Sequence, residues 1–509
     1  MTSKKQQKQD KRNEKLFDDI VYRGHKAAFS EKRRNPSQSN KKGGGLADAE
    51  SEDAMARDYI RLLRLLLSGA LVKLSALEDP RKEGMCGHTM PTLIIYGLLM
   101  FLMNLQSRRA ANRDIGGNTA HEMIKQAIPE LDTMPHADTL ARLLEKIDAD
   151  KLESCYEDTI IGFVKSKTFL GLNPGRSLIA VDGTQKFSRR YRFDEHALAK
   201  CHGDENKGRY FVYILESVLI LDNGMVLPLF TEFLENSDGE LDDDAKKQDC
   251  ELKAFTRLTD KIKKHIGKGR VTLVVDSLYA CGPVVSRCKS FGWEYMVTLK
   301  RGSLKTVWED FDGLRKIETK NTLQNKTDED RLQTFNWSNG LEYTYGGNNK
   351  RLHLNIVTCK EEWTEMHPRS GNKPEPKTCG YAWLSSSAVT IDNAVSLCND
   401  IGRKRWRIEN HFHVAKHQGY GYSHCFSYNW NAMRAFHTLM KFAHFINSMI
   451  LSSETTYGYT KAQGARWFIK KVWSVLINRG IQKSEMLFQT SQGGKRRGCI
   501  YRDIRLRAA

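Results

Sequence analysis

The chain lacks both a hydrophobic run long enough to cross a membrane and any close Cys-x-x-Cys pair. A membrane span requires about 20 apolar residues. The longest apolar run, Leu93–Met103, is shorter and is followed by the polar stretch Gln106–Arg109, so we expect a buried helix and no membrane partner. The eleven cysteines are scattered, and the nearest pair, Cys281 and Cys288, does not have zinc-ribbon spacing. We also expect no secretory signal, and therefore reduced thiols in a cytoplasmic protein.

The chain has fewer acidic than basic residues. The chain has 61 Asp and Glu residues against 80 Lys and Arg residues, a formal net charge of +19. This excess favours a polyanionic partner, because lysines and arginines that neutralise phosphates release condensed counterions. A solvated basic surface and a membrane-surface binder are the alternatives, and we favour nucleic acid over both.

The composition changes along the 509 residues, a length that suggests about three domains. Residues 1–50 are basic and poor in large apolar residues, which predicts a disordered arm that either grips DNA nonspecifically or aids solubility. Residues 51–165 have helical periodicity and are predicted to form a DNA-binding region. We expect helices there over residues 57–77, 91–106, 119–128 and 138–147. These helices form either a helix-turn-helix reader with Arg142 and Lys146 exposed or an ordinary bundle, and the sequence favours neither.

Residues 166–300 have strand-forming patterns instead. Asp222-Asn-Gly224 is a strong hairpin turn signal between two apolar runs. The expected elements are, in order, a strand ending at Asp182, strands over 209–221 and 225–233, a helix over 246–266, a strand over 271–275, a helix over 283–291 and a strand over 294–299. This order matches the ribonuclease H-like fold, whose sheet presents acidic residues at strand ends.

A polar, turn-rich and strand-like segment, residues 301–384, interrupts that order. We interpret it as a β-rich insertion before residues 385–425, the second part of the core, which carry Glu409 on a helix. Residues 426–509 are predicted to be a C-terminal helical region with a basic tail. Its helices are expected over residues 430–452 and 461–478. The predicted fold class is therefore α/β, a ribonuclease H-like mixed sheet with a β-rich insertion, flanked by N- and C-terminal helical regions.

Three acidic residues far apart in the chain occupy positions that suit a metal site. Asp182 and Asp276 each follow an apolar, β-branched run, and Glu409 lies on a predicted helix. Hard cations such as Mg²⁺ prefer carboxylate oxygens, and two metal ions can activate both partners of a phosphodiester displacement. An aspartate after a strand is more often a turn residue or a helix cap, so the prediction depends on all three acids together.

Two cations flank Glu409. On a continuous α-helix, Arg405, Glu409 and Lys416 lie within about 40° of one another. Arg405 is suited to bind a phosphate bidentately and Lys416 to neutralise another, so both are candidate DNA-binding residues. The alternative is an exposed helix with i,i+4 ion pairing, which explains Arg405 but not the two aspartates.

These residues resemble the motifs of a known family. Arg405-x3-Glu409-x6-Lys416 resembles the Tyr-x2-Arg-x3-Glu-x6-Lys signature of a large group of bacterial insertion-sequence transposases with a DDE triad. Upstream, Val181–Gln185 resembles the first-Asp motif of that group, and Val275–Ser277 resembles the second.

The resemblance spans roughly residues 90–450 and implies a ribonuclease H-like core with a β insertion before the catalytic Glu. It implies that Asp182, Asp276 and Glu409 are the catalytic and metal-binding residues, holding two Mg²⁺ ions for which Mn²⁺ can substitute. The implied substrate is double-stranded DNA, both the inverted-repeat transposon ends and the target. The implied assembly is a homodimer in a synaptic complex, associated with the nucleoid in the cytoplasm.

One position departs from the signature, because Gly402 replaces its tyrosine. In the family that tyrosine helps to hold a strand-end phosphate, often during hairpin formation, so a hairpin intermediate is not implied here. The tyrosines Tyr279, Tyr420 and Tyr422 are the candidate substitutes.

Two histidines and two tryptophans are further candidates for binding a ligand. His413 and His417, four residues apart, have Zn²⁺-ligand spacing, but no further ligand completes the set, so we favour hydrogen bonding or phosphate contact. Trp337 and Trp383 are candidate DNA-binding residues that stack on an unpaired base, although an aromatic residue in a β segment more often packs in a core.

Two rival functions remain open. One is a catalytically silent, transposase-derived DNA-binding protein. The other is a ribonuclease H-like nuclease that acts on RNA–DNA hybrids. A cleavage assay on duplex and hybrid substrates separates all three hypotheses.

Overall fold

The computed structural model describes residues 49–200, 208–236, 250–366, 374–481 and 504–507, in which the chain forms two compact units. We call residues 176–182 and 267–406 the β-rich unit, and residues 44–175, 183–266 and 407–509 the helix-rich unit. The predicted basic arm and most of the predicted basic tail lie outside the described residues.

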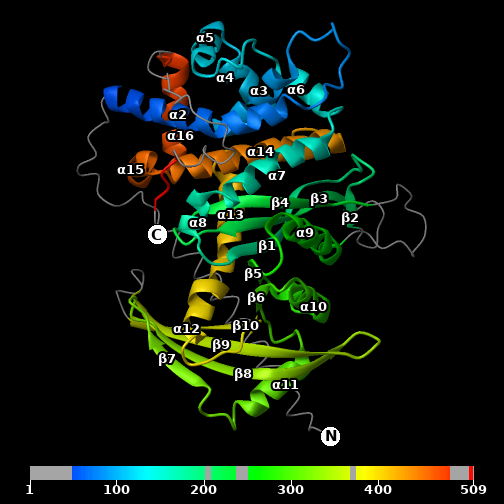
Figure 1. Cartoon of the computed structure of the whole chain (residues 1–509), viewed down its shortest axis with the longest axis vertical. Helices are drawn as coiled ribbons and strands as arrows, with labels where there is room; N and C mark the ends of the chain where they lie inside the picture. The colour runs from blue at the N-terminus through cyan, green and yellow to red at the C-terminus, as the bar shows by residue number, and fades with distance from the viewer. Residues whose placement is uncertain (1–48, 201–207, 237–249, 367–373, 482–503, 508–509) are drawn as a thin grey trace. The chain divides into compact units, whose positions relative to one another are not determined.

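Parallel strand pairs form the centre of the β-rich unit (Figure 1). β1 (Ser177–Arg189) begins in this unit and pairs with β5 (Val271–Val275), and β5 pairs with β6 (Glu294–Thr298). All residues of β5 are buried, which explains its unbroken apolar sequence. The helix α10 (Gly282–Phe291) provides the crossover that two parallel strands require.

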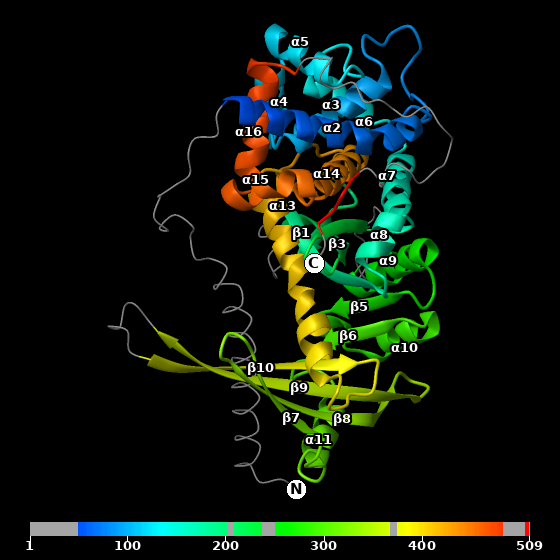
Figure 2. The same ribbon diagram turned by 60° about the vertical axis from the view of Figure 1, so that its left-hand side comes forward.

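The segment after β6 forms a helix and four antiparallel strands. The strands are β7 (Thr322–Lys326), β8 (Leu332–Tyr345), β9 (Lys350–Met366) and β10 (Pro374–Ser385). They pair in succession, and β10 pairs with β6, so this segment extends the central strands of the unit. Figure 2 shows α11 (Lys305–Leu314) beside β8, against which it packs. The strand-rich character expected for this region is present, together with a helix that was not expected.

A buried ionic group fixes the last part of the β-rich unit. After α12 (Ala394–Ser396) and a π-helical turn, the chain forms a 3-10 helix over Gly402–Trp406. Arg403 in this 3-10 helix donates to Glu361 of β9 at 2.5 Å, and its guanidinium lies 4.5 Å from the centroid of the Tyr381 ring. Glu361 is buried, so the ion pair is shielded from water and restrains the 3-10 helix.

The helix-rich unit is organised around α14 (Trp430–Leu451), which is buried along most of its length. The helices α2 (Ala49–Leu74), α3 (Met90–Leu102) and α7 (Ala149–Val164) pack against it. The apolar run predicted as a buried helix is α3, in which every residue except Pro91 is buried. The remaining helices outside the strand region are α4 (Arg108–Ile115), α5 (Asn118–Ala127), α6 (Ala137–Leu144), α8 (Lys167–Leu172), α13 (Arg407–His417), α15 (Glu454–Gln463) and α16 (Ala465–Asn478).

The strands of this unit are those of the predicted hairpin. β3 (Arg209–Ile220) and β4 (Val226–Leu234) pair antiparallel, and the turn places Gly224 at a φ of +82°, a conformation that favours glycine. β2 (Leu198–Lys200) pairs with the outer part of β3, and β3 neighbours β1 in the strand order. α9 (Glu251–Ile266) packs on the hairpin.

Several element boundaries differ from those predicted. β1 does not end at Asp182 but continues to Arg189. The helix expected over 461–478 is two helices, because Gly464 adopts a φ of +88° between α15 and α16. The helices α4, α7 and α8 were not predicted.

The predicted fold class is confirmed at the level of a mixed α/β protein with a large mixed sheet and helical regions toward both ends of the described chain. Among the described helices, none combines the length and apolar character that a membrane crossing requires. The domain boundaries drawn from the sequence stay a prediction.

Candidate active site

Asp182 and Asp276 occupy equivalent positions on neighbouring parallel strands. In the β-rich unit Ala180 of β1 pairs with Val274 of β5. Two residues further along each chain stand Asp182 and Asp276. Neighbouring strands lie about 4.8 Å apart and equivalent positions face the same side of the sheet, so this pairing favours a short distance between the two carboxylates. The pairing ends at Ala180 and Val274, and the predicted juxtaposition of the two aspartates stays a prediction.

Asp276 is oriented by the backbone that follows it. It caps a short 3-10 helix, Ser277–Tyr279, and its Oδ1 atom accepts a hydrogen bond from the amide of Leu278 at 2.8 Å. The helix-cap role that the sequence left open is thus present. It does not exclude metal binding, because a carboxylate has two oxygens and this hydrogen bond restrains the orientation of the group.

Asp182 faces Arg405 within the same unit. The Nη1 atom of Arg405 lies 3.6 Å from Oδ2 of Asp182. Arg405 is buried, and its guanidinium stacks 4.6 Å from the centroid of the Trp406 ring. The prediction that Arg405 shares one α-helix with Glu409 is wrong, because Arg405 lies in the preceding 3-10 helix. Its phosphate contact stays a prediction.

Glu409 and Lys416 do share an α-helix, α13 of the helix-rich unit. Seven residues apart, they lie within about 20° of one another around its axis. Both are half-buried, and the Nζ atom of Lys416 donates to the hydroxyl of Thr184 at 2.6 Å. Helix α13 packs against β3 and β4, so the hairpin sets its position.

Beneath α13 lies a buried polar network that the sequence analysis missed. Glu216 of β3 is fully buried, and its Oε1 atom is 3.0 Å from Nε2 of His437 and accepts a hydrogen bond from the hydroxyl of Tyr422 at 3.0 Å. Its Oε2 atom lies 3.5 Å from Nε2 of His411, which belongs to α13. A single acidic residue inside the apolar run Tyr213–Leu221 was the available signal, since a carboxylate is buried only with partners.

The protonation states of this network follow from burial. Burial alone would raise the pKa of Glu216, but hydrogen bonds from His411 and His437 lower it well below its ordinary value. Burial lowers the pKa of His437 to about 4. Burial also lowers the pKa of Lys186, which donates to the Tyr422 carbonyl, to about 8. The network therefore holds a charged carboxylate against a neutral imidazole at neutral pH.

Gly402, the position at which the family signature has tyrosine, has no room for a side chain. A Cβ atom there would lie 2.9 Å from the indole of Trp383 and 3.3 Å from the side chain of Met296. The three tyrosines considered as substitutes, Tyr279, Tyr420 and Tyr422, are all buried. The structure thus offers no exposed tyrosine hydroxyl at any of these positions.

The remaining predicted DNA-binding residues differ in exposure. Arg142 is exposed, and so is Lys146. Trp337 and Trp383 are only 4% and 3% exposed, so both indoles pack in the interior of the β-rich unit. Base stacking by these tryptophans, which the sequence suggested, requires that they become exposed and stays a prediction.

The histidine pair does not form a metal site with described residues. The rings of His413 and His417 lie with their centroids 4.9 Å apart. Throughout the described ranges, no group of three or more His, Cys, Asp or Glu side chains is arranged to hold a metal ion. The sequence interpretation that favoured hydrogen bonding or phosphate contact over zinc is compatible with this arrangement.

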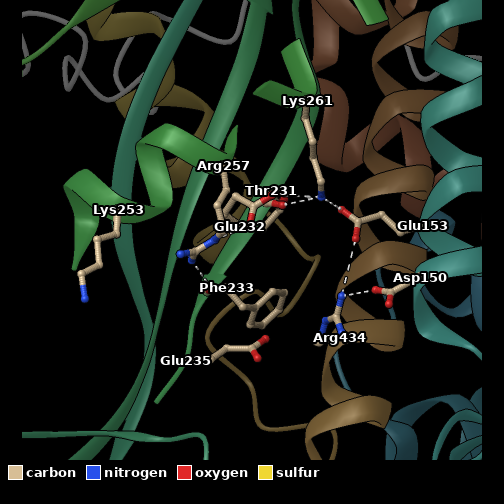
Figure 3. Close-up of a pocket in the computed structure, with 10 residues that line it drawn as sticks. All are labelled: Asp150, Glu153, Thr231, Glu232, Phe233, Glu235, Lys253, Arg257, Lys261 and Arg434. Atoms are coloured by element: carbon tan, nitrogen blue, oxygen red, sulfur yellow. Dashed lines mark hydrogen bonds and ion pairs between the residues drawn. The ribbon is translucent and has the colours of Figure 1, made fainter. Parts of the chain in front are cut away.

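A charged cavity beside the hairpin is internally neutralised. It measures about 420 Å³ and lies between α7, β4, α9 and α14 (Figure 3). Lys261 contacts Glu153 and Glu232 at 3.2 Å each, and Arg434 contacts Asp150 at 2.5 Å. Its cations and carboxylates pair with one another, which indicates a structural ionic network rather than an anion site.

Two of the three predicted acids follow neighbouring parallel strands of one unit, while Glu409 belongs to the other unit, and among the described residues the three do not form a metal-holding group. Two adjacent carboxylates are the ligand type that Mg²⁺ prefers, so the donor set of Asp182 and Asp276 fits a hard divalent cation. The mixed sheet with helical regions toward both ends of the described chain has the architecture of the ribonuclease H-like class.

Comparison with models of protein families identifies the family of the chain. A model of the transposase DDE domain matches residues 174–446, more than half of the chain, and a model described as DDE_Tnp_1-associated matches residues 71–159. The chain belongs to the DDE-domain transposases. No curated protein compared with the chain matches it.

Proposed function

We propose that this transposase binds the inverted-repeat ends of a mobile element, cleaves a phosphodiester bond there and joins the freed 3′-OH to target DNA. The observation that supports the proposal is the parallel pairing of β1 with β5 within the matched transposase domain, because Asp182 and Asp276 each follow two residues after the pair Ala180 and Val274. Glu409 on α13 is the proposed third carboxylate.

In this proposal Asp182, Asp276 and Glu409 hold two Mg²⁺ ions, which when bound supply an acidified water and stabilise charge on the attacked phosphate. In the first displacement, a water oxygen bonds to phosphorus and the 3′ oxygen leaves as a hydroxyl. In the second, that hydroxyl bonds to a target phosphorus and displaces its 3′ oxygen. No covalent bond between protein and DNA is required.

The chain's own cations position the substrate for these steps. Arg405 restrains the Asp182 carboxylate through their 3.6 Å contact and is also proposed to bind a phosphate of the substrate. Lys416, anchored on Thr184, is proposed to neutralise a further phosphate, and the exposed Arg142 to contact DNA in the helical region. Catalysis then depends on positioning and charge neutralisation.

The proposed assembly is a homodimer that holds two transposon ends in a synaptic complex, in the nucleoid of the cytoplasm. Light scattering of the chain with and without end DNA tests the stoichiometry. A one-to-one complex of chain and end, without pairing of ends, would contradict the synaptic part of the proposal.

A cleavage assay tests the proposed activity. The DNA that flanks the reading frame is first searched for inverted repeats, and duplexes carrying those repeats are incubated with the full chain in Mg²⁺ or in EDTA. We expect Mg²⁺-dependent nicks at the repeat ends and joining to a supercoiled target plasmid. Binding without any cleavage would favour the silent DNA-binding protein, and preferential cleavage of RNA–DNA hybrids would favour the nuclease.

A further inference from the structure

A basic cavity on the helix-rich unit is not explained by the proposed active site. It has a volume of about 470 Å³ and is lined by Ser188, Arg189, Arg190, Tyr191 and Arg209. The end of β1 and the start of β3 supply these residues. Three of these five are arginines and none of the described lining residues is acidic, so they concentrate positive charge.

Arg189 is held in a fixed orientation at this cavity. Its Nε atom donates to the hydroxyl of Tyr428 at 2.9 Å, and its Nη1 atom donates to the carbonyl of Ser188 at 2.9 Å. The guanidinium also lies over the rings of Phe187 and Tyr428, at 5.1 and 5.6 Å from their centroids. The hydroxyl of Tyr191 donates in turn to Tyr428 at 3.0 Å. A guanidinium oriented in this way loses little conformational freedom when it binds an anion.

The other two arginines are exposed, and no described carboxylate pairs with Arg190 or Arg209. The acidic residue nearest to Arg190 in the described sequence, Asp194, forms an ion pair with His196 at 2.8 Å. This arrangement contrasts with the cavity of Figure 3, where Lys261 and Arg434 are paired with carboxylates. Arginines gathered without counter-charges repel one another, and a polyanion relieves that repulsion.

We propose that this cavity binds the phosphodiester backbone of a DNA strand, with Arg189 as a fixed fork and Arg190 and Arg209 as flanking contacts. The inference rests on the proposed function, because it assigns a further contact for the same DNA substrate. Arginine matches the geometry of phosphate oxygens, and backbone contacts fix the register of DNA without selecting its sequence. Since β1 carries both Asp182 and Arg189, one strand supplies residues to the acidic edge and to this cavity.

The test measures the binding of the full chain to a fluorescein-labelled DNA duplex of mixed sequence by anisotropy, in EDTA, over a series of salt concentrations. For the variant R190Q/R209Q we expect the slope of log affinity against log salt to become shallower by about 2, because each lost phosphate contact removes about one released counterion. The variant R190K/R209K, which keeps both charges, should retain the parent slope.

The matched control is K268Q/R270Q, which removes the same amount of positive charge. Both residues precede β5, whereas Asp276 follows it. Its slope should equal that of the parent. The variant Tyr428→Phe keeps all charges but removes the acceptor that orients Arg189, so we expect about fivefold weaker binding with an unchanged slope. Thermal unfolding of each variant verifies that the exposed substitutions leave the fold intact.

Each outcome separates this proposal from the proposed function. An unchanged slope in R190Q/R209Q overturns the cavity as a DNA contact, whereas end cleavage by the parent chain still supports the transposase activity. An equal loss in K268Q/R270Q also overturns it, since overall charge would then explain the binding. A parent chain that fails to bind DNA at all overturns both proposals.

Discussion

Asp182 in β1 and Asp276 just after β5 each stand two residues beyond Ala180 and Val274, which pair on neighbouring parallel strands. Two carboxylates at strand spacing repel each other, and a cation between them relieves the repulsion. Arg405 supplies one cation, at 3.6 Å from Asp182. The pairing of β1 with β5, on which the proposed acidic edge depends, is set by the buried residues of these two strands.

The contact between Arg405 and Asp182 predicts a loss of stability when the arginine is removed. Arg405 is only 7% exposed, so Arg405→Gln leaves Asp182 without its charged partner and the site of the guanidinium poorly filled. We expect the free energy of unfolding to fall by about 1–3 kcal/mol in urea titrations. Arg142→Gln, at an exposed position, should change it by less than about 0.5 kcal/mol. Equal stability of the two variants would show that the ion pair contributes nothing.

The close approach of Gly402 to Trp383 predicts a steric penalty for any side chain at position 402. In Gly402→Ala the new Cβ atom would lie 2.9 Å from the indole, so we expect a loss of about 1–3 kcal/mol in stability. Combining it with Trp383→Leu should give a double variant that is more stable than the sum of the two single changes predicts, because the smaller side chain vacates the contested space.

Gly313 in α11 provides the matched control for this prediction. A Cβ atom there meets no neighbour within 4 Å and the residue is helical, so Gly313→Ala should be neutral or stabilising by about 0.5–1 kcal/mol. A Gly402→Ala variant as stable as Gly313→Ala would contradict the packing described for Trp383.

The buried network around Glu216 predicts a loss of stability in mild acid. The pKa of His437 is 6.5 in the unfolded chain and about 4 in the folded chain, so between these values the unfolded state binds the extra proton and stability falls as the pH decreases. At 1.36 kcal/mol per unit this contribution is about 3 kcal/mol. Glu216 acts in the same direction, since its lowered pKa confers stability that is lost as the pH falls below 4.5.

Urea unfolding midpoints measured between neutral pH and pH 4.5 test this prediction. In His437→Gln the amide can still donate to Glu216 but cannot titrate, so its midpoint should decrease less with pH than that of the parent. Parallel decreases in the two proteins would show that His437 is not responsible. The charged neighbours Lys186 and Lys441, which are also buried, are unchanged in the comparison.

Strong local signals in the sequence located much of the fold. The turn Asp222-Asn-Gly224 fixed the hairpin of β3 and β4, and the unbroken apolar run of β5 matched its complete burial. The two aspartates were found for the same reason, because their apolar flanks are the buried strands that place them. The sequence predicts a strand end at Asp182, but β1 continues through this residue. Polar residues on a half-buried strand resemble those of a loop, which explains the difference.

Other features depend on contacts that a single sequence does not display. Arg405 precedes α13 in a 3-10 helix, and helical periodicity alone cannot detect that change of pitch. The partners of Glu216 come from α13 and α14, more than 190 residues away in the chain, as the positions of His411 and His437 show. Gly402 was recognised as a departure from the family signature, but only the packing of Trp383 explains it.

The central claim is that Asp182, Asp276 and Glu409 act together to hold divalent metal for DNA cleavage. Titration of Mn²⁺ into the full chain bound to end DNA, followed by electron paramagnetic resonance, measures this directly in the parent and in D182N, D276N and E409Q. We predict that each single variant weakens Mn²⁺ binding by at least about tenfold and abolishes cleavage, while DNA affinity in EDTA stays at the parent value. Parent-like Mn²⁺ affinity and cleavage in any one of the three variants would contradict the account.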